Sequence, residues 1–287
     1  IMEIKTIVYV ILAIILAPLA GGLLAGIDRR LTAWFQGRFG PPILQPFYDV
    51  IKLLGKDRQV VNYWQIFCAH IYLVAAILCV ALFAMQGDLL MIFFVMTIGA
   101  VFMVAGAMAA PSPYSQLGAQ RELIQMLTYE PLLVIVFVGI YFVTGSFKID
   151  AILAYDRPIF LLLPLLYLVL TFALTIKLRK SPFDISASHH AHQELVRGVL
   201  TEYSGPYLAI LEIAHWYDIV LILAICGLFW NTSFIGMVVL LAVTYMAEIL
   251  IDNVTPRMTW KWMLTYVWAV GISLSFFNMA LLYAKNF

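Results

Sequence analysis

Eight apolar segments of roughly 20 residues follow one another along the chain, and they constrain its fold more than any other feature. A helix of about 20 apolar residues crosses the hydrocarbon core of a bilayer. The sequence therefore predicts an all-α polytopic membrane protein of about eight transmembrane helices, with residues 1–287 as a single transmembrane domain. The expected spans are 4–27, 66–86, 89–109, 120–144, 159–177, 207–230, 233–255 and 262–284.

The composition agrees with burial in lipid and argues against other classes. Hydrophobic residues make up 64% of the chain and charged residues 11%, which a water-soluble surface could not accommodate. The net charge of +1 gives no basic field to attract nucleic acid. The three cysteines lie far apart in apolar runs, so no redox centre is expected. Asp28 and two arginines follow the first run without a cleavage site, so it is interpreted as a retained first helix.

The Lys and Arg residues gather on one side of the expected membrane. Thirteen lie in or beside the connections 1–2, 3–4, 5–6 and 7–8, against four on the opposite side. Cytoplasmic connections carry an excess of Lys and Arg. The two long connections, 28–65 and 178–206, are therefore expected to face the cytoplasm, with both termini outside and the chain in the cell membrane.

Acidic residues persist inside the expected spans, where a carboxylate at the bilayer centre costs at least about 2.5–3.5 kcal/mol. Glu212 and His215 are three residues apart, and Glu248 and Asp252 are four apart, so each pair shares a helix face. We expect these residues to form an ion path, and we expect no catalytic residue in this chain. The full expected set is Glu122, Glu130, Glu194, Glu202, Glu212, His215, Asp218, Glu248 and Asp252.

Glu130 is expected to be the central relay of this set. It lies eight residues beyond Glu122, about 12 Å deeper along the helix, and no Lys or Arg lies within one turn of it along the chain. Glu194 and Glu202 are also eight residues apart. On a continuous helix their directions differ by about 80°, so both are expected to face one polar cavity that leads to the buried set.

A structural explanation competes with the ion path. Arg121 stands beside Glu122 and Arg257 follows Asp252, so these acidic residues are open to interpretation as ion-paired packing residues. The expected orientation places all the acidic residues of the spans in the cytoplasmic half or near the midplane. A path within this chain alone would therefore not cross the membrane, and a hand-off to a neighbouring membrane subunit is the simplest expectation.

The long connections hold two further features. Residues 43–54 have apolar positions spaced for a helix that lies on the membrane surface, which would serve as a docking platform or as a plain surface helix. His189, His190 and His192 form a cluster that lacks the separated ligands of most metal sites, so no metal is expected. Imidazole titrates near neutral pH, and we expect the cluster to face a docked subunit or else to be solvated.

Two loop motifs and one helix motif resemble NuoH, the membrane subunit of respiratory complex I. The first motif is Gly37-Arg38-Phe39-Gly40-Pro41-Pro42 before the amphipathic segment. The second runs through Ser181-Pro182-Phe183-Asp184, Gln193-Glu194-Leu195 and Glu202-Tyr203-Ser204-Gly205. The span containing Thr128-Tyr129-Glu130 matches the acidic helix motif of that family. The resemblance covers most of the chain.

One departure points to a particular branch. Where NuoH has an acid-rich stretch before Gln-Glu-Leu, this chain has the histidine-rich segment 186–192. That segment is similar to EchB, the NuoH-like subunit of energy-converting [NiFe] hydrogenases. The resemblance implies an ion-path and anchoring subunit without a cofactor of its own. The residues that we expect to dock partner subunits, on the two long connections, are Arg38, Gln45, Asp49, Lys52, Asp184, His189, His190 and His192.

The same resemblance implies the partners. They are a hydrogenase large subunit with the [NiFe] centre, a small subunit with iron–sulfur clusters, a ferredoxin-like iron–sulfur subunit and an antiporter-like membrane subunit. The alternative is a NuoH-type subunit of a quinone- or methanophenazine-reducing relative of complex I. A free-standing transporter would show repeated halves, which the sequence lacks, and a passive anchor would not need its buried acidic residues.

Overall fold

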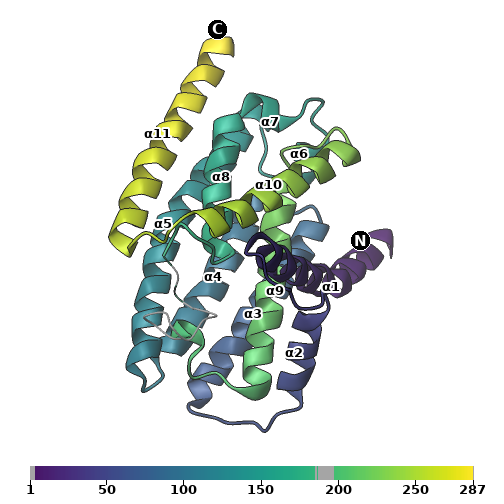
Figure 1. Cartoon of the computed structure of the whole chain (residues 1–287). Coiled ribbons are helices and arrows are strands. Elements are labelled where there is room, and N and C mark those ends of the chain that lie inside the picture. The colour runs from purple at the N-terminus through teal and green to yellow at the C-terminus, as the bar shows by residue number, and fades with distance from the viewer. Residues whose placement is uncertain (1–3, 185, 187–196, 287) are drawn as a thin grey trace. The chain divides into compact units, whose positions relative to one another are not determined.

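The computed structural model consists of α-helices and the segments that connect them (Figure 1), and it describes residues 4–184, 186 and 197–286. In these residues the only β-type pairing is one isolated bridge between Asp88 and Lys148. The elements are α1 (Ile4–Phe35), α2 (Gln45–Leu54), α3 (Tyr63–Ala84), α4 (Leu89–Met108), α5 (Pro113–Thr144), α6 (Ile149–Leu153), α7 (Ile159–Leu162), α8 (Pro164–Lys177), the 3₁₀ helix η1 (Gly198–Leu200), α9 (Gly205–Gly227), α10 (Phe234–Val254) and α11 (Trp260–Asn286).

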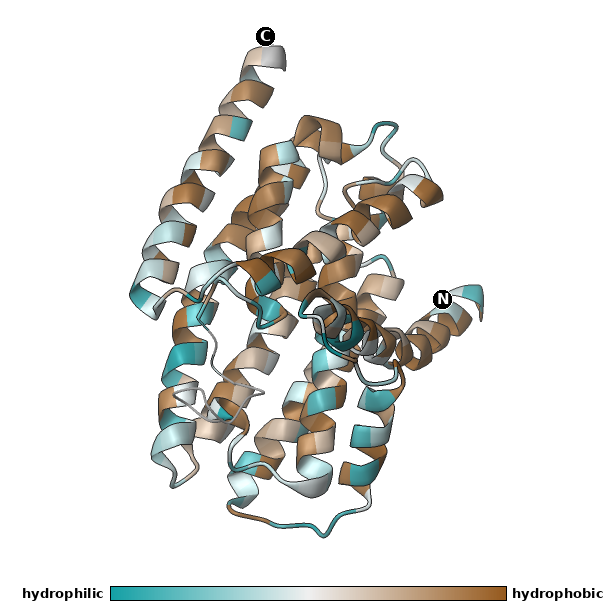
Figure 2. Cartoon of the chain, viewed as in Figure 1, coloured by the Kyte–Doolittle hydropathy of each residue, from teal (hydrophilic) through white to brown (hydrophobic). Residues whose placement is uncertain are grey.

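Seven of the described helices, α1, α3, α4, α5, α9, α10 and α11, are long and apolar enough to cross a membrane. Figure 2 shows hydrophobic residues along most of their length. Together with the shorter apolar helix α8, they confirm an all-α polytopic membrane protein. The orientation with cytoplasmic loops and external termini stays a prediction.

The chain divides into two compact units, which are described separately. The expected single domain stays a prediction. The first unit comprises residues 1–85, 93–123 and 185–221, and the second comprises residues 86–92, 124–184 and 222–287.

Two helices extend beyond the expected spans. α1 continues to Phe35 rather than residue 27, so Asp28 and Arg29 lie on the helix, and α5 begins at Pro113 rather than residue 120. Hydropathy detects the part of a helix that lies in hydrocarbon, and it misses polar turns that continue into the interface. Pro113 fits the first position of α5, because the N–H group at that position has no acceptor within the helix and proline loses nothing by lacking it.

In the first unit, α2 packs against α1 and α9, and glycines of α1 allow the close approach. A Cβ atom at Gly22 would lie 2.6 Å from the ring of Phe47 on α2. Val50 of α2 and Trp216 of α9 form the buried centre of this contact, and the rings of Phe47 and Trp216 are 5.1 Å apart. The surface helix expected at 43–54 is therefore present and anchored by its apolar face.

In the second unit, the fifth expected span is broken rather than continuous. Residues 159–177 form α7 and α8, separated at Leu163 and Pro164. Pro164 has no N–H and its ring obstructs the helical path, so the regular hydrogen bonds stop there. The fourteen residues of α8 reach only about 21 Å, which is shorter than a bilayer core.

Asn278 of α11 satisfies the backbone groups that this break exposes. Its Oδ1 accepts hydrogen bonds from the N–H groups of Leu165 at 2.8 Å and Leu166 at 3.2 Å. Its Nδ2 donates to the carbonyl oxygen of Leu162 at 3.1 Å. The side chain is buried, with 2% exposed, so no solvent replaces these bonds. One amide thereby closes both sides of the interruption and ties α11 to α7 and α8.

We predict that Asn278→Leu destabilises the protein by about 3 kcal/mol or more, since each buried backbone group left unsatisfied costs about 1–3 kcal/mol. The measurement is thermal unfolding of the purified, assembled protein in detergent. Ser275→Ala is the matched control on α11, because the Ser275 hydroxyl bonds only the Gly271 carbonyl of its own helix. Equal losses in the two variants would show that the break does not depend on Asn278.

Candidate functional site

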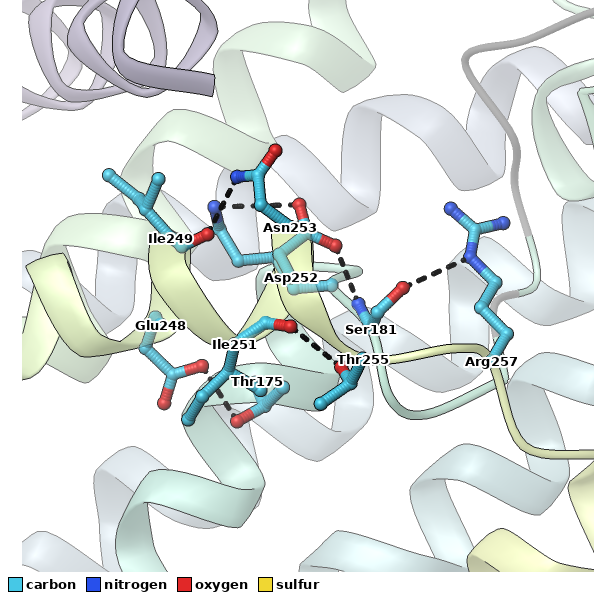
Figure 3. Close-up of polar contacts among 10 residues, drawn as sticks. Thr175, Ser181, Glu248, Ile249, Ile251, Asp252, Asn253, Thr255 and Arg257 are labelled. Atoms are coloured by element: carbon cyan, nitrogen blue, oxygen red, sulfur yellow. Dashed lines mark hydrogen bonds and ion pairs between the residues drawn. The ribbon is translucent and has the colours of Figure 1, made fainter. Parts of the chain in front are cut away.

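The second unit contains a row of buried polar contacts between α8 and α10, here called the polar ladder. Its α10 members, Thr244, Glu248 and Asp252, are four residues apart and so share one face of the helix. Thr244 and Tyr167 of α8 share a hydrogen bond of 2.6 Å between their hydroxyl oxygens. Figure 3 shows the other end of the ladder, where Glu248 and Asp252 point toward α8 and the segment that follows it.

Glu248 is the most buried carboxyl group of this ladder, with 2% of the residue exposed. Its Oε2 lies 2.8 Å from Oγ1 of Thr175, and the same Oγ1 lies 2.8 Å from the carbonyl oxygen of Thr171. A hydroxyl has one proton to donate. Thr175 therefore donates to a Glu248 carboxylate, or it donates to Thr171 and accepts from a protonated Glu248. Glu248 can gain or lose a proton without either partner moving.

Asp252 is held by groups of the segment after α8. Its Oδ1 accepts from the backbone N–H of Ser181 at 2.8 Å, and its Oδ2 lies 4.0 Å from the Nζ of Lys180. The Lys180 side chain is 3% exposed, so its charge requires this partner. Arg257, which the sequence offers as a counter-charge for Asp252, instead donates to Oγ of Ser181 at 3.4 Å (Figure 3).

The Pro-Phe-Asp motif lies beside this ladder and packs into the second unit. The Phe183 side chain is buried, with 2% exposed. The backbone carbonyl of Asp184 accepts from Nε2 of Gln125 on α5 at 2.6 Å, and the carbonyl of Pro182 accepts from the N–H of Met258 at 2.7 Å. Asp184 is only partly exposed, so its expected role in docking stays a prediction.

Glu130 is partly buried on α5 in the same unit. The Nζ of Lys177 on α8 lies 5.3 Å from the ring centre of Tyr129, the residue before Glu130. Packing thus brings a cation that is distant in the sequence to the residue next to Glu130.

The first unit holds several of the expected path residues in separate contacts. Asp218, with 5% exposed, accepts a hydrogen bond of 2.6 Å from the phenol of Tyr72. Glu122 accepts from the hydroxyl of Ser186. His215 is half-buried one turn beyond Glu212 on α9.

Glu212 faces Arg197, with 3.9 Å between Oε1 and the guanidinium nitrogen, and it lines a pocket beside α2. Glu202 is half-buried, next to Tyr203. Burial raises the pKa of the Tyr203 phenol above its usual value, so this side chain stays neutral. Its hydroxyl hydrogen is directed to the backbone carbonyl of Gln65, at 3.4 Å.

Of the expected docking residues, Asp49 of α2 forms an ion pair of 2.9 Å with Arg29 of α1 and accepts from Gln45 at 2.9 Å. Arg38 is exposed and contacts the side chain of Gln36, and Lys52 is exposed at the end of α2. The remaining expected residues, Glu194, His189, His190 and His192, lie outside the described residues. Among the residues described, no group of three or more His, Cys, Asp or Glu side chains is placed to hold a metal ion.

The α8 side of the ladder was not predicted from the sequence. Thr175, Tyr167 and Lys180 became significant only through packing against α10. The spacing of Thr244, Glu248 and Asp252 by four was available in the sequence. It would have marked one polar face on an otherwise apolar helix.

The fold and this site define a polytopic membrane protein whose helices enclose carboxyl groups in contact with hydroxyl and ammonium groups. The chain belongs to the NADH dehydrogenase family, whose model matches residues 6–283. The resemblance to NuoH seen in the loop motifs is thereby confirmed.

Individual relatives agree with this assignment. The chain is 30% identical to hydrogenase-4 component C of Escherichia coli (strain K12), and the match covers 66% of this chain. It covers 64% of hydrogenase-4 component C, so the chain spans less than two thirds of that protein. It is 27% identical to an NADH-quinone oxidoreductase subunit of Geobacillus kaustophilus (strain HTA426), over 94% of this chain and 90% of that protein. It shares the fold of a chain in the membrane-bound sulfane sulfur reductase, an archaeal respiratory membrane complex. The TM-score is 0.82 and the identity 24%, with 97% of this chain and 100% of that chain covered. The chain is thus a NuoH-like membrane subunit of the complex I or hydrogenase type.

We predict that Thr175→Val destabilises the assembled protein by about 1–3 kcal/mol, because it leaves the buried Glu248 carboxyl without its hydroxyl partner. Thr175→Ser keeps the hydroxyl and should cost much less. Thr171→Val is the matched control, since that hydroxyl bonds only the Leu168 carbonyl of its own helix. Thermal unfolding measures all three variants.

A double-mutant cycle separates this hydrogen bond from general packing. In a Glu248→Leu background the Thr175→Val change should lose most of its cost. A cost that is unchanged in that background would contradict a direct interaction between the two side chains.

Proposed function

We propose that this chain is the membrane anchor and ion-path subunit of a ferredoxin-linked, energy-converting hydrogenase. In this function, electron transfer in the partner subunits is coupled to ion translocation through the membrane. The [NiFe] centre and the iron–sulfur clusters belong to those partners. This chain contributes proton-binding side chains and a surface for assembly.

The single observation that carries the ion-path part is the contact between Glu248 and Thr175. A carboxyl group buried inside a membrane helix costs several kcal/mol unless it has a partner or a function. An ion pair would satisfy a carboxylate only, whereas a hydroxyl accepts or donates according to the state of its neighbour. The Glu248 site therefore suits a group that binds and releases a proton during turnover.

Coupling requires that a charge change in a partner subunit influence Glu248, and the Asp252–Lys180 ion pair provides a connection for this. Both are joined to the segment after α8, which runs into the connection that holds His189, His190 and His192. A charge change in a partner docked on that connection would act on the ion pair, and the ion pair lies one helical turn from Glu248. The chemistry of the ladder thus supports a link between a docking surface and a buried proton-binding group.

The choice of a hydrogenase rests on the histidine-rich segment and on relatives of that kind. Besides hydrogenase-4 component C, the chain is 30% identical to formate hydrogenlyase subunit 4 of Escherichia coli (strain K12), over 66% of each chain. The alternative is a quinone- or methanophenazine-reducing relative of complex I. It is favoured by the broader coverage of the NADH-quinone oxidoreductase relatives, one of which, from Rhodopseudomonas palustris (strain ATCC BAA-98 / CGA009), matches 98% of this chain.

Membrane vesicles that contain the complex distinguish these two functions. We expect hydrogen evolution from chemically reduced ferredoxin, with acidification or ion uptake on the vesicle side opposite the peripheral subunits. Quinone-site inhibitors should leave this turnover unchanged. Inhibition by such compounds, together with no hydrogen evolution, would favour the quinone-reducing alternative.

We further predict that Glu248→Gln and Glu130→Gln each abolish ion translocation while assembly and hydrogenase activity with an artificial dye remain largely intact. Glutamine keeps the size and hydrogen bonding of glutamate but cannot ionise. The measurement is ion uptake per hydrogen evolved in vesicles. Asp156→Asn removes an exposed carboxylate outside the long helices and serves as the control. Undiminished translocation in both glutamine variants would show that the buried carboxyl groups serve packing only.

A further inference from the structure

A pocket of about 230 Å³ lies in the first unit, between the last turns of α1, the helix α2 and the first turns of α9. Four basic side chains line it, from three separate parts of the chain: Arg29, Lys52, Lys56 and Arg197. The sequence placed Lys52 on a docking helix but gave no sign that a pocket exists beside it.

The charges of this pocket do not balance. Asp49 lies 2.9 Å from Arg29, and Glu212 lies 3.9 Å from Arg197, so each carboxylate faces one arginine. Among the described residues that line the pocket, four cations and two carboxylates leave an excess of two positive charges. In the described part of the chain, neither Lys52 nor Lys56 has an acidic partner within 4.0 Å. The excess therefore resides on these two lysines, which are four residues apart and line the same pocket.

The other wall of the pocket is apolar. It is formed by Val50 of α2 with Leu208 and Trp216 of α9, which are 7%, 4% and 5% exposed. A small inorganic anion would make no use of such a wall. A ligand that fits both parts carries a negative group and an attached hydrocarbon segment.

The surrounding elements place the pocket at the membrane surface. The exposed side chains of α2 include Tyr48, Ile51 and Leu54, with 54%, 65% and 51% exposed, so this short helix has an apolar edge free for lipid. Such a helix lies at the boundary between headgroups and acyl chains. The pocket also adjoins the polar end of α1, which carries Arg29.

We propose that this pocket binds the phosphate headgroup of an anionic phospholipid, held by Lys52 and Lys56, with the first part of an acyl chain against Trp216. The two lysines supply a charge of +2 to a phosphodiester group. Arg29 and Arg197 hold their carboxylates in place and add positive potential at the mouth. The bound lipid fixes α2 against α9, so the site also stabilises the surface helix.

Three other ligands fit these observations less well. A neutral quinone ring would gain nothing from two unpaired lysines, whose charges would then remain uncompensated. Free phosphate would leave the apolar wall unused. An acidic protein surface would reach Lys52 and Lys56 but would not enter a pocket lined also by the buried side chains of Val50 and Leu208.

The test uses the purified complex, stripped of lipid in detergent and titrated with phosphatidylglycerol or phosphatidylcholine, with binding followed by native mass spectrometry. We expect wild type to prefer phosphatidylglycerol. In Lys52→Gln/Lys56→Gln its affinity should fall about thirtyfold, since each lysine near an anionic lipid contributes about a factor of five. Lys52→Arg/Lys56→Arg should remain close to wild type.

Lys148→Gln/Lys261→Gln is the matched control, because it removes the same charge from exposed positions outside the pocket. An equal loss in this control, or equal binding of both lipids to wild type, would overturn the proposal. If inorganic phosphate binds with the same dependence on Lys52 and Lys56, the ligand of the pocket is free phosphate and not a lipid. If Lys52→Gln/Lys56→Gln loses peripheral subunits while its affinity for lipid is unchanged, the pocket is a contact for a protein partner and the proposal is wrong. If the double variant does not assemble, Lys56→Gln alone should lower the affinity about fivefold, and an unchanged affinity would equally overturn the proposal.

Discussion

Hydrocarbon offers no hydrogen bonds, and every backbone polar group inside the membrane helices must therefore find its partner within the protein. The break between α7 and α8 illustrates the rule for the backbone. Pro164 removes one donor and interrupts the succession of helical bonds, and the freed groups are satisfied by a single amide, that of Asn278. The position of α11 against α8 follows from this requirement as much as from apolar packing.

The same constraint decides how acidic side chains are arranged. Glu248 is enclosed between apolar helix faces, and the group that contacts its carboxyl is a hydroxyl on α8 rather than a fixed cation. Asp252, one turn closer to the helix end, has a cation and a backbone N–H instead. The Asp252 side chain is also less enclosed than Glu248, with 26% of it exposed. The more deeply enclosed group has a partner that tolerates both of its protonation states.

Hydropathy predicted the approximate positions of the long helices because lipid acts on every residue of a span in the same way. It did not predict that α1 continues to Phe35, since the turns with Asp28 and Arg29 are helical without being apolar. It also did not predict the break at Pro164, because a proline near the start of an apolar run is compatible with a continuous span that begins one turn later. These features depend on neighbours that are distant in the sequence.

The candidate site was predicted in part for a similar reason. Acidic residues within apolar runs are visible in the sequence, whereas partners such as Thr175 are ordinary residues until packing brings them close. Adjacency suggested Arg257 as the counter-charge of Asp252, whereas packing pairs Asp252 with Lys180 and places Arg257 against Ser181.

The two polar regions differ in the feature that decides their chemistry, which is the balance of charge. Glu248 in the ladder is enclosed and contacts a hydroxyl that can donate or accept a hydrogen bond, so its site suits a group that binds and releases a proton. The pocket beside α2 is open, has an excess of two cations and borders an apolar wall, so it suits a bound anion that stays. The proposed function needs both properties, because a proton-binding group must exchange its proton readily while the surface helix α2 must remain in place.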